Sequence, residues 1–136
     1  MKTFHLVFGG LVVITFLLTG QYMDRYLAHL EFTPDLHRMF YRSRHIYILL
    51  AGLLNLGLGA YLRLAEERWR RVLQVIGSLL IVTATVLFVM AFIYEPPVTN
   101  FGAPFARKAI YLISYGTLMH AISAIRIRKA EKRGQG

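Results

Sequence analysis

The sequence contains no cysteine among its 136 residues. Thiol relays, disulfide exchange and cysteine-ligated metal centres each need a thiolate, so the sequence excludes all three. The small membrane oxidoreductases that shuttle disulfides are thereby removed from the classes of protein to consider.

Acidic residues are scarce, with seven Asp and Glu against 16 Lys and Arg and a net charge of +9. None of the seven lies in the long apolar segments, whereas proton-coupled transport needs a carboxylate inside the membrane. A small-molecule transporter is therefore only our third functional hypothesis. The sequence also lacks HExxH, GxSxG and a glycine-rich phosphate loop, so an enzyme is not favoured.

Hydrophobic residues make up 56% of the chain and charged residues only 17%. A membrane-spanning helix needs about 20 mostly apolar residues. Four segments meet this requirement: 4–20, 45–64, 72–94 and 109–125. Backbone groups in lipid must pair internally, and the alternation typical of a membrane barrel is absent. We predict one all-α domain over residues 1–136, an integral membrane four-helix antiparallel bundle.

The distribution of basic residues predicts an orientation. An even number of spans places ten Lys and Arg on one side and six on the other. Positive residues favour the cytoplasmic side of a membrane. We therefore expect both termini and the tail 126–136 in the cytoplasm. The expected location is the inner membrane of a bacterial cell. The basic loops are expected to meet anionic membrane lipids, and nucleic acid is not an expected partner.

The first outer loop, residues 21–44, is named here the outer ledge. Its apolar residues recur at helical spacing, which predicts a surface helix lying on the membrane: Tyr22, Tyr26, Leu27 and Leu30. Thr33 as N-cap, with Pro34 at the first helical position, predicts that a second helix begins here and continues to Leu64.

Three arginines of the outer ledge, Arg38, Arg42 and Arg44, form a positive cluster. Guanidinium groups bind carboxylates and phosphates through paired hydrogen bonds. We therefore predict that the cluster docks an anionic lipid or an acidic partner, either a membrane or a periplasmic protein. The outer carboxylates available for pairing with these arginines are Asp24, Asp35 and Glu95.

Two histidines, His5 and His120, are expected at similar depth near the cytoplasmic interface, each with a glycine one turn deeper, Gly9 and Gly116. A haem between two axial histidines needs small residues where the macrocycle passes a helix. The alternative is that these glycines allow close helix packing and that the histidines bind headgroups or water.

A third histidine, His45, begins a helical stripe that should face the bundle interior: Ile48, Gly52, Asn55 and Gly59. An Asn inside a membrane is costly unless it is hydrogen-bonded. Its expected partners on the third helix are Ser78, Thr83 and Thr85. The functional alternative is that Asn55 contacts a quinone or a lipid.

Three stretches, FHLVFGGLVVITFLLTGQYM, HIYILLAGLLNLGLGAYLRL and SYGTLMHAISAI, resemble helices of the small bacterial four-helix b-type cytochromes of the inner membrane. The resemblance implies one haem b, with His5 and His120 as ligands of the haem iron. His45 is the candidate for a second cofactor site, but the fourth helix has only one histidine and offers it no ligand partner. Our first functional hypothesis is nevertheless a small accessory or scaffolding subunit. An electron-transfer haem protein is the alternative.

Overall fold

The structure is a computed structural model that describes residues 1–27, 35–95 and 103–125. Its elements are α1 (Lys2–Tyr22), the π-helix η1 (Met23–Leu27), α2 (Asp35–Tyr61), α3 (Arg68–Tyr94) and α4 (Pro104–Ala124). No strand occurs within the described ranges. The all-α prediction is confirmed for this part of the chain.

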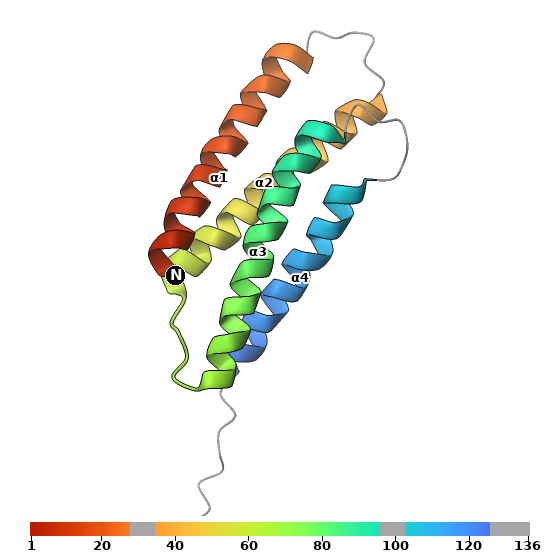
Figure 1. Ribbon diagram of the computed structural model, residues 1–136. Helices are drawn as coiled ribbons and strands as arrows, with labels where there is room; N and C mark the ends of the chain where they lie inside the picture. The colour runs from red at the N-terminus through yellow and green to blue at the C-terminus, as the bar shows by residue number, and fades with distance from the viewer. Residues whose placement is uncertain (28–34, 96–102, 126–136) are drawn as a thin grey trace, which may run out of the picture.

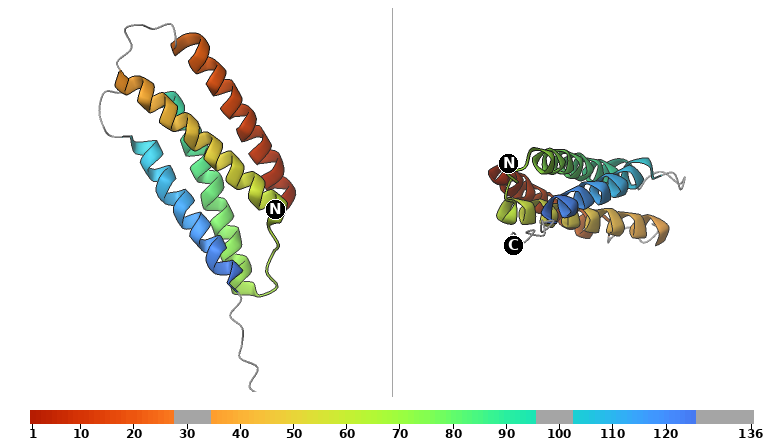
Figure 2. Two further views of the ribbon diagram at one scale, coloured as in Figure 1. Left: turned by 180° about the vertical axis from the view of Figure 1, so that it is seen from behind. Right: turned by 90° about the horizontal axis from the view of Figure 1, so that it is seen from below.

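The helices form two antiparallel hairpins. α1 packs along α2, α3 packs along α4, and a smaller contact between α2 and α3 joins the hairpins (Figure 1). Seen from behind, α1 and α4 lie on opposite edges of the molecule (Figure 2). We call the end with the starts of α1 and α3 the proximal end, and the end with the starts of α2 and α4 the distal end.

Two of the helices, α1 and α3, are long and apolar enough to cross a membrane. The first candidate span runs from Lys2 to Tyr26 and the second from Arg68 to Tyr94. α2 and α4 do not meet the same criterion. α2 carries three arginines in its first half, and α4 carries Arg107 and Lys108 in its first turns.

The boundaries of the first two helices differ from the expected ones. α1 continues directly into η1, so residues 21–27 extend the first helix and form no separate surface helix. The expected helix start at Thr33 and Pro34 lies outside the described residues. α2 runs without interruption from Asp35 but ends at Tyr61, three residues before Leu64.

Glycines allow the helices of each hairpin to approach closely. A Cβ added at Gly9 lies 2.7 Å from the Leu56 nitrogen of α2, and one at Gly116 lies 2.7 Å from the Gly77 oxygen of α3. Each distance is shorter than carbon contacts in proteins permit, so only glycine fits. The side chains buried between the helices form one core cluster that includes Ile48, Ile81, Ala84, Phe88 and Ala109.

Candidate functional site

A buried polar network connects three helices near the middle of the molecule. His5 Nδ1 lies 2.8 Å from Asn55 Oδ1, and Asn55 Nδ2 donates to Thr85 Oγ1 at 3.0 Å. His5 is 1% exposed, while Asn55 and Thr85 have no exposed surface. Thr85 was one of the expected partners of Asn55, and this prediction is confirmed. The participation of His5 was not predicted.

The hydrogen bonds of this network fix the position of the His5 proton. The Thr85 hydroxyl donates to the Ile81 oxygen, so its lone pair accepts from Asn55 Nδ2, which also donates to the Ala51 oxygen. Asn55 Oδ1 must then accept a hydrogen bond from His5 Nδ1. His5 Nδ1 is therefore the donor in this network.

His45 forms an equivalent bond at the distal end. The Thr19 hydroxyl donates to the Phe16 oxygen at 2.9 Å, so Thr19 Oγ1 accepts from His45 Nδ1, also at 2.9 Å. The His45 ring stacks on Phe16 with ring centroids 4.0 Å apart. The stripe that follows it is buried at Ile48, Gly52, Asn55 and Gly59, as predicted. His45 thus joins α2 to α1.

His120 belongs to the other hairpin. Its Nε2 lies 3.1 Å from Ser78 Oγ, and its ring covers Gly77 of α3. His5 instead contacts α2, and α1 and α4 lie on opposite edges of the molecule (Figure 2). Each of these two histidines is therefore held by a polar side chain of the partner helix in its own hairpin.

The packing around these histidines bears on the haem hypothesis. An unprotonated Nε2 on His5 is what an axial ligand needs. However, Gly9 is filled by the Leu56 backbone and Gly116 by the Gly77 backbone, so neither glycine leaves the space that a porphyrin requires. The residues present do not fit a haem between His5 and His120, and the two glycines serve helix packing.

Arg44 forms a buried ion pair with Glu95. Arg44 Nη2 lies 3.1 Å from Glu95 Oε2, with the two side chains 7% and 4% exposed. Glu95 Oε1 also accepts hydrogen bonds from the backbone nitrogens of Phe105 and Ala106 at the start of α4. The expected pairing of Glu95 with an outer arginine is confirmed. This pair commits Arg44 to a contact within the protein.

The remaining arginines line a cavity at the distal end. It has a volume of about 330 Å³, and its lining includes Asp24, Arg38, Tyr41, Arg42 and His45. Burial, and then the neighbouring Tyr22, raise the pKa of the Tyr41 hydroxyl above its ordinary value. The hydroxyl is therefore protonated at neutral pH and can donate a hydrogen bond to an anion. We call this cavity the ledge cavity.

The sequence did not predict the role of Gln74, which is 6% exposed. Its Oε1 accepts from the Ala65 nitrogen at 2.9 Å and its Nε2 donates to the Arg63 oxygen at 3.0 Å. Arg71 Nε donates to the Ala65 oxygen at 3.1 Å. Gln74 and Arg71 thereby fix the loop between α2 and α3. The available signal was an amide within an otherwise apolar run.

No family model, curated protein or solved structure matches the chain. The resemblance to four-helix b-type cytochromes is therefore not tested by these comparisons, and it stays a prediction.

Proposed function

We propose that this chain is a non-catalytic accessory subunit with four membrane spans, which docks an anionic group in the ledge cavity. The observation that carries the proposal is the placement of Arg38 and Arg42 around one cavity of about 330 Å³ at the distal end. That volume is at the lower limit of ligand pockets, and suits a carboxylate or a phosphate group. The remaining helical scaffold positions this cavity.

Packing of the hairpins supports four spans. α2 lies alongside α1, and α4 alongside α3, and both neighbours are apolar enough to cross a membrane. A membrane that contains α1 and α3 must therefore contain most of α2 and α4. Both carry exposed large apolar side chains that suit lipid, including Leu50 and Leu53 on α2 and Leu118 and Ile122 on α4. The distribution of basic residues supports an inner membrane with the distal end outside.

The proposal is tested by purifying the tagged chain from native membranes in mild detergent. Bound proteins and bound lipids are both quantified by mass spectrometry, so an acidic protein and a lipid headgroup are distinguished. We expect one bound species in stoichiometric amount, and its loss in the Arg38→Gln, Arg42→Gln double variant. The matched control is Arg107→Gln with Lys108→Gln, because both residues are exposed and lie at the same end.

Equal binding by the two double variants would contradict the proposal, as would a chain that purifies with no bound species in stoichiometric amount. Arg44 is left unchanged in this experiment because it forms the buried ion pair with Glu95. Changing it would alter the stability of the distal end together with any docking.

The electron-transfer alternative predicts a haem band in a reduced-minus-oxidised absorption spectrum, lost in His120→Ala. The packing of Gly9 and Gly116 against helix backbone disfavours this alternative. A quinone contact at Asn55 is disfavoured for a similar reason, since His5, Thr85 and the Ala51 oxygen already use its amide.

A further inference from the structure

A groove runs between α2 and α4, which pack mainly on their neighbours and not on each other. Its middle part has a volume of about 480 Å³ and is lined by Leu50 and Leu54 of α2 and by α4 residues that include Ile113, Thr117 and Ala121. The rim is open to the surroundings, since Leu50 is 54% exposed. This part of the groove is apolar and lies within the proposed membrane span.

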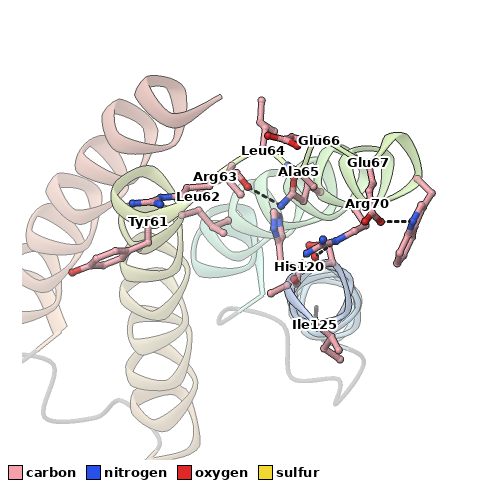
Figure 3. A pocket seen from close by; sticks show the side chains of 16 residues that line it. Tyr61, Leu62, Arg63, Leu64, Ala65, Glu66, Glu67, Arg70, His120 and Ile125 are labelled. Carbon is pink, nitrogen blue, oxygen red and sulfur yellow. Dashed lines mark hydrogen bonds between the residues drawn. The ribbon is translucent and has the colours of Figure 1, made fainter. Parts of the chain in front are cut away.

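A second, polar pocket, named here the proximal pocket, lies nearer the proximal end and is lined by the next turns of the same two helices. The same stripe of α2 passes from Leu54 to Leu58 and Tyr61, and that of α4 passes to His120 and Ser123. The pocket has a volume of about 890 Å³. Figure 3 shows side chains from α2, the following loop, α3 and α4 around it. An apolar groove and a polar pocket thus follow one another along α2 and α4 toward the proposed membrane surface.

Charges of both signs line the proximal pocket: Arg63, Glu66, Glu67 and Arg70. Within the described residues, the one ion pair joins Arg44 and Glu95 at the distal end, so these four side chains do not neutralise one another directly. Arg70 presents a guanidinium group beside His120 (Figure 3), which suits a phosphate, and Glu66 carries a carboxylate, which suits an ammonium group.

The pocket is held in place by its own hydrogen bonds. Arg70 Nε donates to the Ser123 oxygen at the end of α4 at 2.7 Å, which fixes the guanidinium and satisfies one terminal carbonyl. In the described part of the chain, the two terminal guanidinium nitrogens of Arg70 form no hydrogen bond or ion pair. Glu67 accepts from Trp69 Nε1 at 2.9 Å, so Glu66 is the more available carboxylate. Gln74 fixes the loop that carries both glutamates.

We infer that this groove binds one phospholipid with an ammonium-bearing headgroup, of the phosphatidylethanolamine class. The phosphate lies against Arg70, the primary ammonium against Glu66, and an acyl chain in the groove between Leu54 and Ala121. Charge complementarity selects this class, because an anionic headgroup leaves Glu66 unpaired and a trimethylammonium group cannot donate a hydrogen bond to it. The inference depends on the proposed membrane placement but not on docking at the ledge cavity.

The experiment uses the full-length chain in detergent and follows the fluorescence of Trp69, which is the only tryptophan and lines the proximal pocket. The protein is titrated with dioleoyl phosphatidylethanolamine, phosphatidylglycerol and phosphatidylcholine. We expect phosphatidylethanolamine to bind about tenfold more tightly than the other two lipids. One additional charge-assisted hydrogen bond accounts for a difference in affinity of about this size. Glu66→Gln should remove this preference, and Arg70→Gln should weaken binding of all three lipids.

Binding of the acyl chain is tested separately with Ala121→Phe, because Ala121 lines the groove and a phenyl ring there fills it. We expect it to weaken dioleoyl phosphatidylethanolamine about tenfold and to leave the dihexanoyl lipid unchanged, because six carbons do not extend along the groove. The matched control is Ile122→Phe, since Ile122 is exposed on the same helix but lies outside the groove. It should bind both lipids as the parent does.

Equal affinity for the three headgroups would overturn the inference, and so would an Ala121→Phe variant that binds like Ile122→Phe. Carbonate extraction of membranes beforehand tests membrane placement: a chain released as a peripheral protein refutes the proposed function and this inference together. A chain that is retained but shows no lipid preference refutes the inference alone, because the ledge cavity lies at the opposite end.

Discussion

At the scale of single residues, the buried polar side chains act as links between helices. His5 bonds to Asn55 across α1 and α2, His45 to Thr19 across the same helices, and His120 to Ser78 across α4 and α3. Interhelical hydrogen bonds of this kind contribute about 1 kcal/mol each in membranes and also define the rotation of each helix. Because single deletions have small effects, glycine substitutions give a sharper test of the packing.

Gly9 and Gly10 are adjacent and provide a matched pair. A Cβ at Gly9 meets the Leu56 nitrogen at 2.7 Å, whereas one at Gly10 meets nothing within 4 Å. We expect Gly9→Ala to lower the free energy of unfolding by about 1–3 kcal/mol, the typical cost of overpacking. Gly10→Ala should change it little or raise it by up to about 1 kcal/mol through helix propensity. Unfolding by SDS in detergent micelles, followed by circular dichroism, measures both, and equal effects would show that Gly9 does not lie at a tight contact.

At the scale of secondary-structure elements, Glu95 connects three helices at the distal end. It ends α3, pairs with Arg44 of α2 and accepts two backbone N–H groups at the start of α4. A carboxylate at a helix N-terminus also interacts favourably with the helix dipole. Arg44 additionally lies over the Phe40 ring, 4.5 Å from its centroid. The RSRH stretch therefore has a partly structural role: Arg44 is buried in the ion pair with Glu95, whereas Arg42 beside it is exposed.

The effects of substitutions at Arg44 and Glu95 on stability should not be additive. We expect Arg44→Met and Glu95→Gln each to cost about 3 kcal/mol of stability, because each leaves its partner buried without a counter-charge. The double variant should cost clearly less than the sum of the two, since it removes both charges. The same unfolding assay measures the cycle, with Arg107→Met, an exposed residue at the same end, as a control expected within about 0.5 kcal/mol of the parent. Strict additivity would show that the two side chains do not interact.

The helices and their buried faces could be predicted from the sequence, but the arrangement of the helices could not. The long apolar runs predicted helices, and the spacing of Ile48, Asn55 and Gly59 predicted the buried face of α2. Sequence spacing could not show that His5 and His120 lie in different hairpins, because four antiparallel helices can be arranged in several ways. Nor could it show that Arg44 is buried and Arg42 exposed, since two residues on one helix face different directions and only the position of Glu95 decides between them.

At the scale of the whole molecule, the two hairpins place chemically different features at opposite ends. The ledge cavity is distal and the proximal pocket lies beyond the ends of α2 and α4. The proposed docking at the distal end and the proposed lipid binding at the proximal end both require a membrane between the two ends. Among the residues that the structure describes, two helices meet the criterion for a span, so the crossing of α2 and α4 is the central claim.

Substituted-cysteine labelling tests this claim most directly, because the chain has no cysteine of its own. Arg42→Cys, Glu66→Cys and Lys108→Cys are each probed in intact cells with a membrane-impermeant maleimide, and after membrane disruption as a control for reactivity. Four spans predict that Arg42→Cys and Lys108→Cys are labelled from outside and Glu66→Cys only after disruption. If only α1 and α3 cross, Arg42→Cys and Glu66→Cys are labelled from the same side and Lys108→Cys from the other, and that result would contradict the account.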